Sequence, residues 1–135
     1  MDDPNSLTGV WDGLFSYPRL YKPTTFTAVL FEIGSALSGT IHELSNNGRR
    51  AGQMLEASID GRRSGSEVYF VKVYPEGMSN HGRPVDYAGR VNADATEIEG
   101  TWTIRGNWSG KFLMIRSGRQ QQAETRRARR SIPVT

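Results

Sequence analysis

Apolar and polar residues alternate along short stretches of this chain between Thr8 and Arg116, and turn-forming residues separate the stretches. Alternation with a period of two residues is typical of β-strands that bury one face, and regular short spacing favours an all-β domain. No segment shows the 3.6-residue period of a substantial helix. The predicted strands are Thr8–Tyr17, Thr25–Ile33, Ala36–Leu44, Gln53–Ile59, Glu67–Tyr74, Val85–Val91, Glu97–Ile104 and Asn107–Arg116.

The connections between these stretches are short, which favours an up-and-down order of strands over a Greek key. Gly34-Ser35 suits a type II′ hairpin, because glycine stands first, and Asp60-Gly61 predicts the end of the fourth strand. Eight strands suffice for an antiparallel sheet to close on itself and leave room for about one small ligand. The sequence therefore predicts a single eight-stranded antiparallel up-and-down β-barrel.

Each strand has one register that collects most of its apolar residues and its mid-strand glycine, and we assign that register to the barrel interior. The second strand is ambiguous, since Phe26 and Leu30 on one face and Val29 and Phe31 on the other are all apolar. Glycine weakens a strand interior, so its recurrence suggests strong curvature or space for a large neighbour. The inward glycines are at positions 13, 39, 89, 100 and 110.

The composition fits one domain of 135 residues. We expect residues 1–7 to form a flexible lead, 8–116 the barrel, and 117–135 a disordered tail. That tail holds five arginines and one glutamate, or +4, so the rest of the chain carries about −1 of the total +3. There is no cysteine and no apolar run of the roughly 20 residues that span a bilayer. The acidic, apolar-poor first residues lead us to expect no secretory signal. A reducing, cytoplasmic location is expected.

Gly9-Val10-Trp11 opens the first strand, and Arg116 ends the last. On these residues and the strand count, the chain resembles the calycins, the superfamily of lipocalins, fatty-acid-binding proteins and avidins. The resemblance implies a barrel closed at one end by Arg116 stacked on Trp11, a cation–π contact, and a general small-ligand role. The chain lacks the lipocalins' Thr-Asp-Tyr stretch and the avidins' full set of biotin-binding polar side chains, so no particular ligand is implied.

Several inward positions are polar or charged, where a purely structural core would be apolar. Burying an unpaired charge is costly, so Glu43 and Lys72 should be paired, lie near a barrel mouth, or contact a ligand. With aromatic residues around them they would orient a small molecule in an aromatic cup. The predicted ligand-binding residues are Tyr17, Glu43, Phe70, Lys72, Tyr87, Trp102 and Phe112.

The first functional hypothesis is non-covalent binding of a small, largely apolar molecule inside the barrel. An alternative is an interaction module whose barrel is filled by its own side chains and whose outer face or tail docks a partner. A third is an isomerase or hydrolase that uses a carboxylate inside the barrel. His42 and His81 show no metal-ligand spacing, so neither a metal nor a cofactor is expected. No specific nucleic-acid binding and no membrane insertion are expected, and a homodimer stays open.

Overall fold

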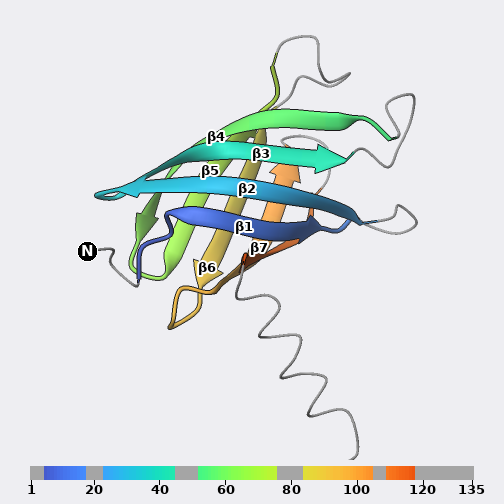
Figure 1. Cartoon of the computed structure of the whole chain (residues 1–135). Coiled ribbons are helices and arrows are strands. Elements are labelled where there is room, and N and C mark those ends of the chain that lie inside the picture. Colours follow the sequence, from blue (N-terminus) through green and yellow to red (C-terminus); the bar gives the residue numbers. More distant parts are fainter. Residues whose placement is uncertain (1–4, 18–22, 45–51, 76–83, 105–108, 118–135) are drawn as a thin grey trace, which may run out of the picture.

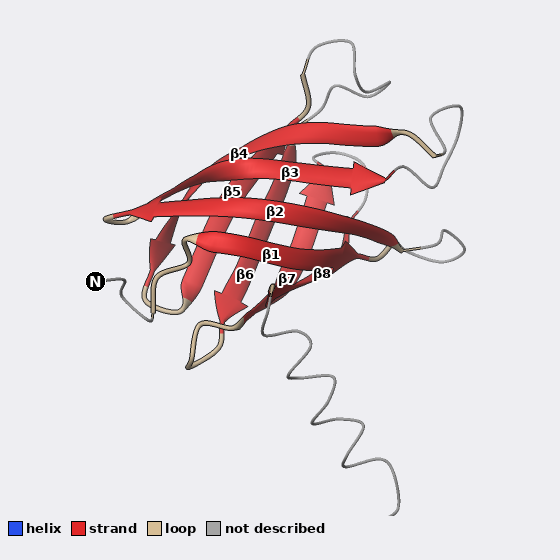
Figure 2. Ribbon diagram, viewed as in Figure 1, coloured by secondary structure: helices blue, strands red, loops and turns tan. Residues whose placement is uncertain are grey.

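The chain forms one closed β-barrel (Figure 1). The computed structural model describes residues 5–17, 23–44, 52–75, 84–104 and 109–117. These residues form strands, turns and loops without a helix (Figure 2), and so without a helix long and apolar enough to cross a membrane. The strands are β1 (Gly9–Phe15), β2 (Thr24–Ile33), β3 (Ala36–Leu44), β4 (Met54–Ser64), β5 (Glu67–Val73), β6 (Val85–Val91), β7 (Glu97–Ile104) and β8 (Ser109–Arg116).

Each strand pairs antiparallel with the next strand in sequence, and β8 returns to pair with β1. In that last ladder Trp11 lies opposite Arg116 and Phe15 lies opposite Phe112. A closed barrel has no free sheet edge, so all eight strands find backbone partners on both sides. The predicted all-β, up-and-down barrel of eight antiparallel strands is confirmed.

The fourth strand is longer than predicted, and the turn expected at Asp60-Gly61 is wrong. β4 continues to Ser64, and Gly61 pairs with Leu37 of β3 and with Phe70 of β5. A Cβ atom on Gly61 would overlap the backbone of β5, so glycine here permits a close approach between strands and does not mark a turn. The hairpin turn lies instead after Ser64, where Gly65 has a φ of +60°.

The ambiguous second strand has a definite inner face. Phe26, Ala28 and Leu30 are buried, whereas Phe31 is half exposed on the outer surface. The other strands bury the predicted register, and their side chains form one continuous core. The predicted inward residue Trp108 lies outside the described residues.

The two ends of the barrel differ. At one end the connections are the short turns that follow β2, β4 and β6. In the turn after β2, Gly34 has a positive φ of +61° and the φ of Ser35 is not positive, as a type II′ turn requires. Leu7, the last residue of the expected lead 1–7, is fully buried at this end and belongs to the core. The connections through residues 16–23, 45–53, 74–84 and 105–108 leave from the opposite end, which we call the loop end.

The inward glycines let neighbouring backbones and rings approach closely. A Cβ atom on Gly100 would lie 2.0 Å from the carbonyl oxygen of Ala88 on β6, and one on Gly89 would lie 2.6 Å from the carbonyl oxygen of Glu99 on β7. Both contacts are with backbone atoms, and the approach is closer at Gly100, so Gly100 is the stricter requirement. The curvature of β6 and β7 therefore depends on glycine at this position.

We predict that Gly100→Ala lowers the free energy of unfolding by about 1–3 kcal/mol, because the added methyl group must push β6 away from β7. The neighbouring outward substitution Thr101→Ala should change it by less than about 0.5 kcal/mol. Urea unfolding of both variants measures the difference. Equal stabilities would contradict the close approach at Gly100.

Candidate functional site

The turn end of the barrel is closed by Arg116 and Trp11. The Arg116 guanidinium carbon lies 4.6 Å from the centre of the indole ring, and its nitrogens donate hydrogen bonds to the carbonyl oxygens of Ser6, Thr8 and Ala95. The indole nitrogen of Trp11 donates to the carbonyl oxygen of Leu7 at 2.9 Å. These contacts tie the first strand, the last strand and the segment before β1 into one plug, with the geometry that the resemblance implied.

A buried ion pair lies in the other half of the barrel. The Lys72 ammonium on β5 donates to Glu43 Oε2 on β3 at 3.0 Å, and the two side chains are only 2% and 5% exposed. The Tyr74 hydroxyl donates to the other carboxylate oxygen of Glu43. Both residues stand near the strand ends that face the loop end. The two charges therefore neutralise each other in a region from which water is excluded.

Three aromatic rings surround the Lys72 ammonium. Its nitrogen lies 4.6 Å from the ring centre of Phe15, 4.9 Å from that of Tyr74 and 5.4 Å from that of Tyr87. The negative face of an aromatic ring attracts a cation, and the attraction is strongest when the cation is desolvated. The rings thus replace part of the hydration that Lys72 loses on burial.

Lys72, Tyr74 and Tyr87 keep their protons to high pH, because their pKa values are raised. Burial alone would lower the pKa of Lys72, but Tyr87, Tyr74 and Glu43 outweigh it and raise that pKa well above its ordinary 10.5. Burial also raises the pKa of Tyr74 and that of Tyr87 above their ordinary 10, although the Lys72 charge partly opposes it. Lys72 is therefore an ammonium at neutral pH, a hydrogen-bond donor and not a nucleophile.

Aromatic side chains continue from the ion pair toward the middle of the barrel. Tyr87 stacks on Phe70, with ring centres 4.9 Å apart, and meets Phe112 edge-on at 5.0 Å. On the other side Tyr17 meets Trp102 edge-on at 5.6 Å. Their polar atoms are also bonded: the Trp102 indole donates to the carbonyl oxygen of Ser16, and the Tyr17 hydroxyl shares a hydrogen bond with Thr24.

The structure brings the seven predicted ligand-binding residues into one network of contacts. Phe15 links its two halves, because its ring contacts Trp102 and Tyr17 as well as the Lys72 ammonium. Phe15 and Tyr74 were missed as site residues, although both lie on the register that the sequence assigned to the interior. The missing signal was the closure of the barrel, which brings Phe15 on β1 across the interior to Lys72 on β5.

The inner part of this network is densely packed. The side chains of Phe70, Trp102 and Phe112 are 1%, 2% and 3% exposed. A side chain that lined a water-sized cavity would keep more free surface than this, so these rings form a filled floor and not the walls of an empty cup. Tyr17 and Tyr74 remain partly exposed at the loop end. A ligand would reach the network from that end.

The two histidines do not form a site in the part of the chain that the structure describes. His42 points outward on β3 and lies 3.7 Å from Glu56, and His81 lies outside the described residues. The described segments contain no group of three or more His, Cys, Asp or Glu side chains that could hold a metal ion.

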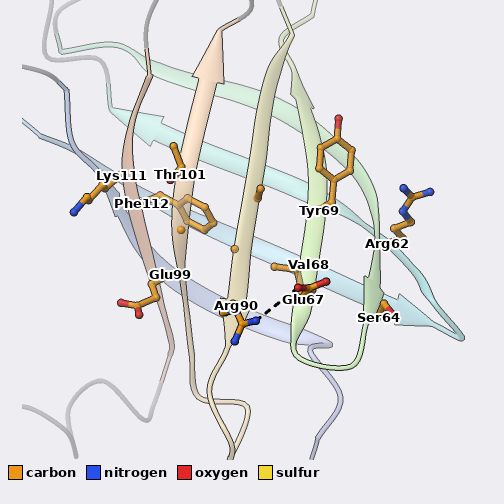
Figure 3. A pocket seen from close by; sticks show the side chains of 13 residues that line it. Arg62, Ser64, Glu67, Val68, Tyr69, Arg90, Glu99, Thr101, Lys111 and Phe112 are labelled. Atoms are coloured by element: carbon orange, nitrogen blue, oxygen red, sulfur yellow. Dashed lines mark ion pairs between the residues drawn. The ribbon is translucent and has the colours of Figure 1, made fainter.

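A hollow of about 800 Å³ lies on the outer surface over the strands β4 to β8 (Figure 3). Gly89 and Gly100 are among its lining residues, and charged side chains stand around it, including Arg62, Lys111 and the exposed pair of Arg90 and Glu67 at 3.7 Å. Charges of both signs alternate on this rim, and the pair is water-exposed. The hollow is thus a second concave surface, chemically unlike the barrel interior.

Comparisons with known proteins support the fold. No protein-family model and no curated protein matches the chain. A solved structure described as the de novo design of a fluorescence-activating beta barrel matches it with a TM-score of 0.64 and 17% sequence identity, over 87% of this chain and 100% of that one. At this identity the match shows an eight-stranded β-barrel, and membership of the calycins stays a resemblance.

We predict strong coupling between Lys72 and Glu43. Lys72→Met leaves a buried carboxylate without its partner and should lower the free energy of unfolding by about 3–5 kcal/mol. Adding Glu43→Gln removes the stranded charge, so the double variant should be more stable than the Lys72→Met single variant. The control Arg90→Met, in the exposed pair with Glu67, should cost less than about 1 kcal/mol. Strictly additive effects in urea unfolding would contradict the pairing.

We also predict an alkaline limit to stability. Lys72, Tyr74 and Tyr87 have raised pKa values when folded, so the unfolded chain releases their protons first. Their contribution to the free energy of unfolding is complete below about pH 10. It is lost as the pH rises above that value, by up to about 1.4 kcal/mol per pH unit for each group. Urea unfolding between neutral and strongly alkaline pH should show a shallower decline for Tyr74→Phe. If the free energy of unfolding of Tyr74→Phe declined with pH as steeply as that of the wild type, Tyr74 would not contribute to the alkaline loss of stability.

Proposed function

We propose that the barrel binds a small, largely apolar molecule through its loop end, where a polar group of the ligand meets Lys72, Glu43 and Tyr74. The observation that carries this proposal is the buried ion pair. An ion pair of this kind is costly to bury and contributes little to stability compared with apolar side chains of similar volume. Its position near one end of the barrel, beside partly exposed tyrosines, supports a role in recognition.

The asymmetry of the barrel supports the same function. Arg116, Trp11 and Leu7 fill the turn end, so a ligand has one route to the interior, from the loop end. The partly exposed rings of Tyr17 and Tyr74 at the loop end would offer apolar surface for a ring or an alkyl chain. Most of the affinity would come from this contact, and the ion pair would orient the ligand. The fold match, described as a fluorescence-activating barrel, supports small-molecule binding in general.

A second function, an interaction module with a filled barrel, is favoured by the dense packing of Phe70, Trp102 and Phe112. In that case the outer surface would carry the binding site. The two functions differ in whether a small molecule occupies the loop end. Native mass spectrometry of the full chain, purified without added ligand, separates them: a retained small molecule supports the first function, and a bare chain favours the second.

We predict that the fluorescent probe 1-anilinonaphthalene-8-sulfonate, an apolar molecule with one negative charge, binds at the loop end. In the variant Lys72→Met/Glu43→Gln its dissociation constant should rise about tenfold or more, because the sulfonate loses a buried ammonium donor. The matched control Arg90→Met/Glu67→Gln removes a pair from the outer surface and should leave the constant unchanged.

Fluorescence titration measures these constants, and circular dichroism checks that each variant is folded. Tyr74→Phe keeps both charges and removes one hydroxyl, so it should raise the dissociation constant of the probe by a smaller factor than the double variant does. The proposal fails if the folded inner variant binds the probe as the wild type does. It also fails if the outer control weakens binding equally.

A further inference from the structure

One side of the outer surface is apolar. Val10 on β1 and Phe31 on β2 are 45% and 50% exposed, and Ile33 at the end of β2 is 79% exposed. Single exposed apolar residues are common on protein surfaces, whereas a contiguous group on neighbouring strands is typical of a binding surface. The outer apolar face, as we call it, consists of Val10, Leu14, Val29, Phe31, Leu113 and Ile115, and Ile33 extends it toward the turn end.

The strand register makes this face continuous. Val10 lies opposite Val29 on β2, and Leu14 lies opposite Leu113 on β8. Since β1 pairs with both β2 and β8, the face spans three adjacent strands (Figure 1). Asp12 is the acidic residue within it, and the Ser117 hydroxyl donates a hydrogen bond to its carboxylate at 2.7 Å.

The remaining outer surface has a different character. Around the hollow over β4 to β8 the outward residues are mostly charged, among them Arg62, Glu67, Arg90, Glu99 and Lys111. Outward positions on β3, such as Ser38 and His42, are also polar. Leu44, Met54 and Val73 are also exposed, near the loop end of β3, β4 and β5. The outer apolar face on β8, β1 and β2 holds more apolar side chains than that second group.

The basic segment of the chain, residues 117–135, begins at this face. The Ser117 amide donates to the carbonyl oxygen of Val10 at 2.8 Å, so the chain leaves β8 beside the outer apolar face. Five arginines and one glutamate follow in the sequence. Anionic lipid headgroups attract such a segment, and apolar side chains enter the boundary between headgroups and acyl chains. Two weak signals of this kind together give stable attachment.

We infer that the outer apolar face docks onto an anionic lipid bilayer, with the basic segment 117–135 supplying the electrostatic attraction. A second copy of the chain explains the observations less well, because symmetric pairing of two such faces would bring two +4 segments together. Nucleic acid would use the arginines but would leave the exposed Val10 and Phe31 without a role. This inference concerns the outer surface and does not depend on the proposed ligand site.

The test is cosedimentation of the full chain with vesicles of phosphatidylcholine, alone or mixed with phosphatidylserine. The wild type should bind only the mixed vesicles. Replacing the four arginines 126, 127, 129 and 130 with glutamine should weaken binding more than about a hundredfold, since each arginine near the surface contributes roughly fivefold. Val10→Ser/Phe31→Ser should weaken it about tenfold or more. The control Arg62→Gln/Arg90→Gln removes two charges on the far side and should have a much smaller effect.

The following outcomes would overturn the inference. Absence of binding to mixed vesicles would do so, as would vesicle binding that Val10→Ser/Phe31→Ser leaves unchanged in a folded variant. The wild type could instead sediment as a dimer that Val10→Ser/Phe31→Ser dissociates, without binding vesicles. That result would assign the face to self-association. Binding of a duplex oligonucleotide through the arginines, without vesicle binding, would assign the basic segment to nucleic acid.

Discussion

Closure of the sheet between β1 and β8 is the constraint on which the other features of this protein depend. The backbone ladder from Trp11 to Phe15 pairs the first strand with the last, and it places Arg116 opposite the tryptophan on which it stacks. Without this ladder two strands would have unpaired edges, and the inward side chains would not converge on a common interior. Closure at small diameter also requires close approaches between strands, and Gly61 and Gly100 permit two of them.

The same closure explains how a charged pair is buried. Glu43 and Lys72 come from strands separated by β4, and only the curvature of the sheet brings their ends to 3.0 Å. The rings of Phe15, Tyr74 and Tyr87 then replace water around the ammonium. In such surroundings the pKa of Lys72 is raised, and Lys72 stays an ammonium across the neutral range. It is thus a rigid polar contact at the base of the loop end.

The inside and the outside of the barrel differ in chemistry. Inside, the rings of Phe70 and Phe112 are packed and buried, whereas Tyr17 and Tyr74 keep some exposed surface at the loop end. Outside, the apolar face on β8, β1 and β2 contrasts with the charged hollow over β4 to β8. The loop-end network and the outer apolar face share no residue, so each can be altered without removing the other.

Period-two alternation was enough to predict the eight strands, their up-and-down order and the inward register, because these depend on local spacing. It failed at Gly61, where a close approach between strands looks like a turn, and it left the inner face of β2 open, since both of its faces are apolar. The seven predicted site residues were found as inward polar and aromatic positions. The tertiary structure decided which side chains contact Lys72, how Phe15 joins the network, and that the aromatic floor is filled. The physical reason is that register and curvature, set by closure across the whole sheet, determine which inward side chains meet and how much space remains between them.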